Sequence, residues 1–131
     1  MFEYKVREVL EVVDGDTLDV EIDLGFAIFI KQRVRLAGID TPESRTTDLN
    51  EKKFGLEAKQ FLKDQLDKCK NITIVTEKPD NKEKYGRFLA WLFLDDSAIS
   101  LNNLMVSKGY AWKYDGGTKT KDFDALLKLR K

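Results

Sequence analysis

A chain of 131 residues, with 35% charged residues and a formal net charge of +0, is typical of a soluble globular domain that buries an ordinary core. It has no histidine and a single cysteine, which excludes imidazole catalysis, an intramolecular disulfide and a cysteine-based zinc site. Any metal ion bound here must therefore be a hard cation held by oxygen atoms. We expect one domain spanning residues 1–131.

The sequence offers no targeting or membrane segment. No stretch approaches the roughly 20 apolar residues that a membrane span requires. Residues 1–6 lack the long apolar run and the small-residue cleavage site of a signal peptide. We therefore expect no membrane association and a cytoplasmic location, or secretion if a leader has been removed.

Charge is distributed unevenly along the chain. Residues 1–30 carry two basic and eight acidic residues, whereas residues 104–131 carry seven basic and three acidic residues. A polyanion would respond to this asymmetry more than to the neutral total. The alternative interpretation is two solvated faces of opposite sign.

The N-terminal third predicts three β-strands. Residues 2–13 form a valine-rich first strand with an irregularity near Glu8, and Asp14-Gly15 predicts a hairpin turn, because glycine accepts the positive φ of a tight turn. Apolar and polar residues then alternate over 17–24. The inward set of this second strand comprises Leu18, Val20, Ile22 and Leu24. A third strand is expected over about 29–39, and Pro42 ends it.

Charged residues share the inward-facing parity of these strands. Asp16 has the parity of the apolar set, and a carboxylate aimed inward is costly unless it is paired, hydrated or metal-bound. Arg33 and Arg35 both share parity with Ala37 and Ile39, so alternation alone does not choose between the two arginines.

The remaining elements follow from apolar spacing, turn residues and caps. In chain order they are a polar loop over 44–53, a helix of about 16 residues over 54–69, a strand over 71–76, a charged loop over 77–84, a strand over 88–94, a short helix from Ser100 to Gly109, a small strand at 110–112 and a last helix over 123–127. The strand over 88–94 is apolar on both faces, so we expect other parts of the protein to cover both of its faces, with Trp91 in the core. The pattern predicts an α+β fold: a five-stranded OB-like β-barrel with about three packed α-helices.

Three short fragments together indicate a family. They are Val-Val-Asp-Gly-Asp-Thr at 12–17, Arg35-Leu36 followed by Ile-Asp-Thr-Pro-Glu at 39–43, and Tyr-Gly-Arg at 85–87. Each fragment alone is a weak signal. In this order and at these separations, they make the chain resemble the staphylococcal (micrococcal) nuclease, or thermonuclease, family.

The resemblance implies a Ca²⁺-dependent endonuclease on an OB-fold, which hydrolyses phosphodiester bonds in DNA and RNA with little sequence preference and leaves 3′-phosphate ends. Carried over by position, the carboxylates of Asp16 and Asp40 and the backbone carbonyl of Thr41 would bind the calcium ion. We expect the chain to act on nucleic acid as a monomer.

The resemblance also assigns the other site residues. Glu43 would activate or orient the attacking water, while Arg35 and Arg87 would stabilise the pentacoordinate phosphate. Lys84 and Tyr85 would contact the nucleotide at the next phosphate and ring. The family's second phosphate-binding tyrosine falls at Asp115 here in strict register. The neighbouring Tyr114 is therefore the candidate substrate contact on that side.

Phosphodiester chemistry requires such groups whatever the family. Negative charge builds on the non-bridging oxygens as water attacks, and planar, bidentate arginines meet that charge better than lysines. A rival interpretation is a non-catalytic OB-fold module, derived from a nuclease, that binds nucleic acid or protein. Retention of the acidic residues and both arginines favours the enzyme.

Overall fold

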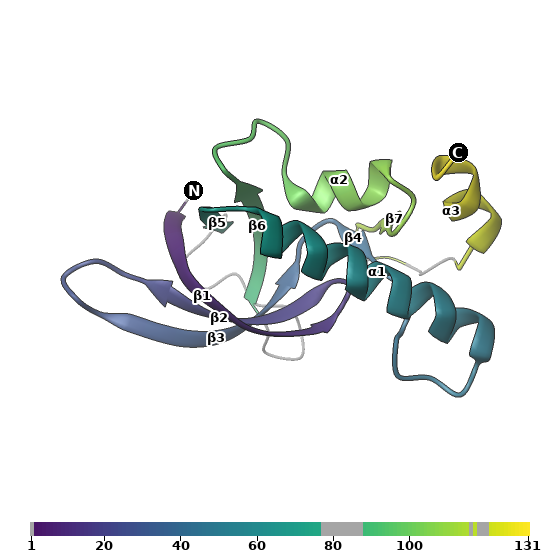
Figure 1. Ribbon diagram of the computed structural model, residues 1–131, viewed down its shortest axis with the longest axis horizontal. Helices are drawn as coiled ribbons and strands as arrows, with labels where there is room; N and C mark the ends of the chain where they lie inside the picture. Colours follow the sequence, from purple (N-terminus) through teal and green to yellow (C-terminus); the bar gives the residue numbers. More distant parts are fainter. Residues whose placement is uncertain (1, 77–87, 116, 118–120) are drawn as a thin grey trace.

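Figure 1 shows the computed structural model, which describes residues 2–76, 88–115, 117 and 121–131. Five strands form a closed barrel in the order β1-β2-β3-β6-β5. Their bounds are β1 Phe2–Asp14, β2 Thr17–Asp23, β3 Phe29–Leu36, β5 Ile72–Thr76 and β6 Phe88–Leu94. A separate pair of short strands consists of β4 (Ile39–Asp40) and β7 (Trp112–Lys113). The helices are α1 (Leu49–Lys68), α2 (Leu101–Ser107) and α3 (Phe123–Leu129). The predicted α+β, OB-like barrel with three helices is confirmed.

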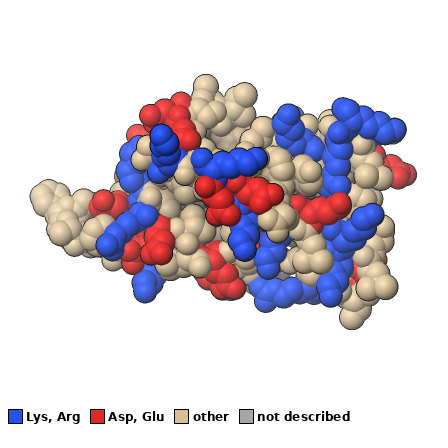
Figure 2. Space-filling view, in the orientation of Figure 1, with Lys and Arg blue, Asp and Glu red and all other residues tan. Residues whose placement is uncertain are grey.

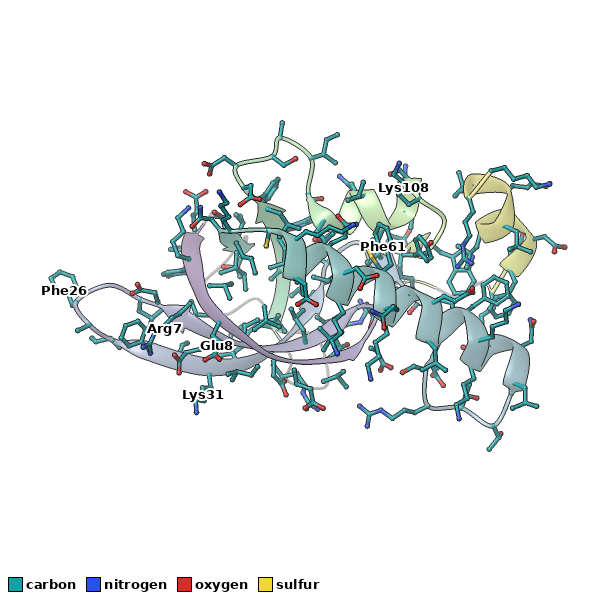
Figure 3. All side chains as sticks on the ribbon, in the orientation of Figure 1. Arg7, Glu8, Phe26, Lys31, Phe61 and Lys108 are labelled. Carbon is teal, nitrogen blue, oxygen red and sulfur yellow. The ribbon has the colours of Figure 1, made fainter. Side chains whose placement is uncertain are left out.

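The alternating pattern of the second strand sets the barrel interior. Leu18 and Val20 are fully buried and Ile22 nearly so, as the alternation predicts. Leu24 lies beyond the end of β2 and is 38% exposed, so its expected place in the core is wrong. The β2–β3 hairpin extends past the barrel at this end, and Phe26 at its tip is 98% exposed (Figure 3).

Gly15, in the turn between β1 and β2, is not required for the positive φ angle that the sequence predicts. Positive φ angles occur at Gly25, Gly38 and Gly109 but not at Gly15. A Cβ added at Gly15 would instead lie 2.7 Å from Cβ of Ala58 and 3.1 Å from Cγ2 of Thr41. The position requires glycine because helix α1 and the segment after β4 pack directly against this turn.

Helix α1 begins earlier than its apolar residues indicate. Asp48 is the N-cap, and its carboxylate accepts hydrogen bonds from the backbone N–H groups of Asn50 and Glu51 at 3.0 and 3.2 Å. The first turn of the helix therefore falls within the predicted polar loop over 44–53. Figure 1 shows α1 running alongside the barrel, with its N-terminal end extending beyond it.

Two expectations for the later strands are corrected. The third strand does not continue to residue 39: β3 ends at Leu36, and a turn through Gly38, with φ of 77°, separates it from β4. Strand β6 pairs with both β3 and β5, but Trp91 is only half-buried on its outer face. A Cβ at Gly38 would lie 2.8 Å from the Trp91 ring, so glycine allows this close approach.

Asn102 joins the barrel to the turn that precedes β4. Its side chain is fully buried in α2. Nδ2 donates to the carbonyls of Ala37 at 2.8 Å and Ala90 at 3.0 Å, and Oδ1 accepts from the Leu92 N–H at 3.1 Å. Because a buried polar group needs partners, this one side chain fixes α2, β6 and the Gly38 turn together.

Replacing Asn102 with alanine should lower the free energy of unfolding by about 3 kcal/mol, because three buried hydrogen bonds and some packing are lost. Urea unfolding measures the change. Asn103→Ala provides the matched control, since Asn103 is the exposed neighbour on the same helix. Equal effects of the two substitutions would contradict the bridging role of Asn102.

The surface carries mixed charge. On the face drawn in Figure 2, acidic and basic side chains are interspersed rather than separated into a basic and an acidic half. Attraction of a polyanion to this face would therefore depend on local groups more than on a broad field. Across the described ranges, none of the helices is long and apolar enough to cross a membrane.

Candidate functional site

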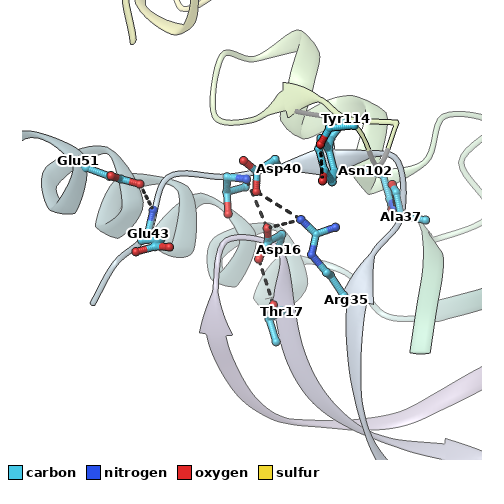
Figure 4. Close-up of polar contacts among 11 residues, drawn as sticks. Asp16, Thr17, Arg35, Ala37, Asp40, Glu43, Glu51, Asn102 and Tyr114 are labelled. Carbon is cyan, nitrogen blue, oxygen red and sulfur yellow. Dashed lines mark hydrogen bonds and ion pairs between the residues drawn. The ribbon is translucent and has the colours of Figure 1, made fainter. Parts of the chain in front are cut away.

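Asp16, Arg35 and Asp40 form a buried charged cluster (Figure 4). Nη2 of Arg35 lies 3.3 Å from Oδ2 of Asp16 and 3.3 Å from Oδ1 of Asp40. The three side chains are only 8–10% exposed. Two carboxylates thus share one guanidinium nitrogen in a region with little water, where electrostatic interactions are strong.

Sheet pairing explains why these distant residues meet. The register of β2 and β3 places Arg35 opposite Thr17, the residue after Asp16. The Leu36 N–H donates to the Asp16 carbonyl at 2.8 Å, which continues the pairing to the residue just before the start of β2. The Gly38 turn then brings β4, and Asp40 with it, back toward the same point.

The structure also distinguishes Arg33 from Arg35, which the alternating pattern places on the same face of the strand. Arg33 lies opposite Asp19 in the β2–β3 register, and its Nε and Nη2 donate to the two oxygens of that carboxylate at 2.8 and 3.1 Å. This pair is on the surface, where the Arg33 side chain is 51% exposed. The hydrogen bond from Arg33 holds the pKa of Asp19 below its usual value. Arg33 is thus a surface residue, and Arg35 is the buried one.

The segment after β4 is held on both sides of Glu43. The Thr41 N–H donates to Oδ2 of Asp16 at 3.3 Å, and the hydroxyl of Ser44 hydrogen-bonds the carboxylate of Asp14. Thr41 and Ser44 are buried, whereas Glu43 is exposed. Glu43 is therefore an exposed residue on a backbone that its buried neighbours hold in place.

Tyr114 lies at the cluster on the opposite side. Its N–H donates to the Gly38 carbonyl at 2.9 Å, and its ring lies below the Arg35 guanidinium, with 5.7 Å from Cζ to the ring centroid. Its hydroxyl donates to the Gly117 carbonyl at 2.9 Å. Asp115 is exposed, and its carboxylate accepts from the Gly117 N–H. Of these two neighbours, Tyr114 is the one that contacts the cluster.

The donor set at the cluster suits a hard cation. Asp16 and Asp40 each direct one oxygen toward Nη2 of Arg35, and Oγ1 of Thr41 is buried without a hydrogen-bond partner in the described part of the chain. Within the described ranges, no group of three or more acidic, histidine or cysteine side chains is placed so that it could hold a metal ion. A metal ion here would depend on two carboxylates completed by backbone and water oxygens, which Ca²⁺ tolerates.

Not every predicted site residue can be placed. Lys84, Tyr85 and Arg87 lie outside the described residues. Sequence reasoning also missed two buried polar residues near the site, Glu51 and Asn102. For Glu51 a signal existed, because an aspartate followed three residues later by a glutamate is a helix-start pattern. Asn102 carries no local signal, since its partners lie on β6 and in the Gly38 turn.

Comparison with known proteins finds a matching family model and several relatives. The family model described as staphylococcal nuclease homologue matches residues 33–131. An uncharacterised protein of Bacillus anthracis is 43% identical over 103 residues, covering 79% of this chain and 44% of its own length. A protein of Shigella flexneri named micrococcal nuclease is 34% identical over 114 residues, covering 82% of this chain and 57% of its own.

A third relative is the protein of Staphylococcus hyicus named thermonuclease, which is 34% identical over 104 residues, covering 79% of this chain and 56% of its own. The chain spans about half the length of these curated relatives. The family model covers more than half of the chain, and it includes the end of β3, all of β4 and the segment with Glu43. The chain therefore belongs to the staphylococcal nuclease homologue family.

Proposed function

We propose that this protein is a Ca²⁺-dependent nuclease that hydrolyses phosphodiester bonds within DNA and RNA and leaves 3′-phosphate ends. The observation that carries the proposal is the buried cluster in which Asp16 and Asp40 share the guanidinium of Arg35. The family and the relatives named as nucleases support a hydrolase that acts on nucleic acid. Calcium dependence and the roles of individual residues are part of the proposal.

The metal would be held by the carboxylates of Asp16 and Asp40 and the carbonyl of Thr41. When bound, Ca²⁺ supplies positive charge next to the phosphate oxygens that become more negative as water attacks. The chain contributes the second source of positive charge. Arg35 uses one nitrogen for both carboxylates, and a guanidinium has five N–H donors, so others can bind a phosphate oxygen.

The other groups act on water and substrate. The exposed carboxylate of Glu43 would orient the attacking water or accept its proton, since no histidine is available for this role. Arg87 would meet the same phosphate as Arg35, and Lys84 and Tyr85 would contact the next nucleotide. Tyr114, which lies against Arg35, would limit the directions from which a phosphate can approach.

The binding-module alternative explains the cluster less well. A module that only binds nucleic acid needs exposed cations and aromatic rings. Two carboxylates buried against one arginine do not help such a module, because their net negative charge repels the phosphates of nucleic acid unless a cation is added. The buried acidic pair therefore favours catalysis over binding alone.

Digestion of plasmid DNA, single-stranded DNA and RNA with Ca²⁺ or with EDTA tests the proposal. We expect cleavage of all three with Ca²⁺, cleavage within the circular plasmid, 3′-phosphate ends by end-group analysis, and no cleavage with EDTA. Asp40→Ala should abolish the activity, whereas Asp19→Ala, a change on the exposed side of β2, should not. Cleavage that persists in EDTA and in Asp40→Ala would overturn the mechanism.

A further inference from the structure

The glutamate in the first turn of α1 is buried beside the proposed catalytic segment. Glu51 is 5% exposed, and both of its carboxylate oxygens are used. Oε2 accepts from the backbone N–H of Glu43 at 3.1 Å, and Oε1 accepts from Nζ of Lys121 at 3.0 Å. Figure 4 shows the Glu51 carboxylate pointing from the helix toward the Glu43 backbone. We propose that Glu51, paired with Lys121, is a positioning residue that fixes the Glu43 backbone for catalysis; this inference rests on the proposed function.

A buried carboxylate requires such an arrangement for its own stability. Burying an unpaired charge is costly, and removing one partner of a buried pair is strongly destabilising. Lys121 supplies the counter-charge from the surface, where its side chain is 46% exposed. The hydrogen bond to Glu51 raises the pKa of Lys121, and the negative charges of Glu51, Glu43 and Asp40 act in the same direction against the opposing effect of burial. Lys121 is therefore the counter-charge that stabilises the buried Glu51 carboxylate.

Helix α1 holds the same backbone by a second contact. Gly55 lies one turn after Glu51, and a Cβ added there would be 2.3 Å from the Glu43 carbonyl oxygen and 2.6 Å from the Ser44 nitrogen. The segment thus rests directly on the bare surface that Gly55 leaves. Helix α1 therefore restrains Glu43 at two backbone groups. The N–H is hydrogen-bonded to Glu51, and the carbonyl packs against Gly55.

The Glu43 side chain gains precision from these contacts. Its backbone is restrained by α1, and its neighbours Thr41 and Ser44 are hydrogen-bonded to the ends of the β1–β2 turn. The carboxylate can then move only through its own side-chain torsions. Because small displacements of a group that acts on water reduce rates strongly, a restrained backbone here favours catalysis.

Glu51→Ala should lower kcat by about tenfold to a hundredfold and leave KM nearly unchanged, because Glu43 is misplaced while the phosphate contacts remain. Glu51→Gln keeps an oxygen that can accept from the Glu43 N–H and should recover most of the lost rate. Glu57→Ala is the matched control, since Glu57 also pairs from α1 with a C-terminal cation, Arg130, at 3.0 Å. This control should retain the wild-type kcat.

Gly55→Ala tests the second contact without removing the hydrogen bond. Alanine favours helix over glycine, so the helix itself is not weakened, yet its methyl group must displace the Glu43 carbonyl. We expect a reduced kcat with the helix content unchanged by circular dichroism. A wild-type kcat in Gly55→Ala would show that the position of this backbone is not critical.

A double variant separates positioning from general stability. If Glu51 acts through Glu43, then Glu43→Ala/Glu51→Ala should be no slower than Glu43→Ala alone, because the group being positioned is already absent. A purely structural role of Glu51 would slow the reaction further in the Glu43→Ala background. Additive losses would therefore overturn the proposal.

Amide hydrogen exchange gives a readout that does not depend on activity. The Glu43 N–H should exchange at least about tenfold faster in Glu51→Ala than in the wild type or in Glu57→Ala, because its acceptor is removed. Unchanged exchange and unchanged kcat would overturn the inference. If the wild-type protein cleaves no nucleic acid, the proposed function fails, and the exchange rates alone decide whether Glu51 holds the Glu43 backbone.

Discussion

Arg35→Lys should cleave single-stranded DNA about 10²–10³-fold more slowly than the wild type at saturating Ca²⁺. The Arg35 guanidinium spans the carboxylates of Asp16 and Asp40 and has further donors for a phosphate. A lysine ammonium is a point charge that cannot form the same planar fork, so either the carboxylate contacts or the phosphate contact is lost. Initial rates with an oligonucleotide substrate measure the effect.

Arg33→Lys is the matched control for this prediction. Arg33 lies two residues earlier on β3, and its partner Asp19 is on the surface. Because an exposed ion pair contributes little to stability, this variant should fold and cleave like the wild type. Similar losses in both variants would show that the buried position of Arg35 has no special role in catalysis.

Asp40→Asn should remove most of the stabilisation that the wild type gains from calcium. At a free Ca²⁺ concentration of about 100 times Kd, binding to the native state raises the free energy of unfolding by about 2.7 kcal/mol. Asparagine keeps the shape of the side chain and one oxygen but loses the charge that attracts the cation. Without metal the variant should still fold, since Arg35 keeps its contact with Asp16.

Urea unfolding with Ca²⁺ and with EDTA measures this difference for each protein. Asp19→Asn serves as the control on the neighbouring strand face and should keep the full gain. Asp16→Asn should behave like Asp40→Asn, because both carboxylates face the same guanidinium. A calcium-dependent gain that survives in both variants would place the ion elsewhere.

Local patterns predicted much of the fold because they are set by periodicity. The alternation over β2 gave the buried faces of Leu18 and Val20, and Ser100 was correctly identified as the cap of α2. The inward parity of Asp16 also held, and this residue is 7% exposed. These features depend on neighbours within a few residues, which the sequence displays directly.

Other features depend on partners far along the chain. Parity could not separate Arg33 from Arg35, because the choice is made by the β2–β3 register and by what covers each end of the hairpin. Gly15 requires glycine because Ala58 lies against it, a contact 43 residues away that no turn statistic encodes. Glu51 and Asn102 are polar residues in helices, and only their tertiary partners explain why they are buried.

The parallel pairing of β3 with β6, which aligns Arg35 with Leu89, joins two parts of the chain that lie far apart in the sequence. The β1, β2 and β3 hairpins are local and can form early, whereas closing the ring joins segments more than 50 residues apart and depends on slow, high-contact-order steps. Arg35 gains its neighbours from β6 only at that closure. A chain that ends before β6 would therefore carry Asp16, Arg35 and Asp40 on an open sheet, without the strand that pairs with β3 beside Arg35 in the closed barrel.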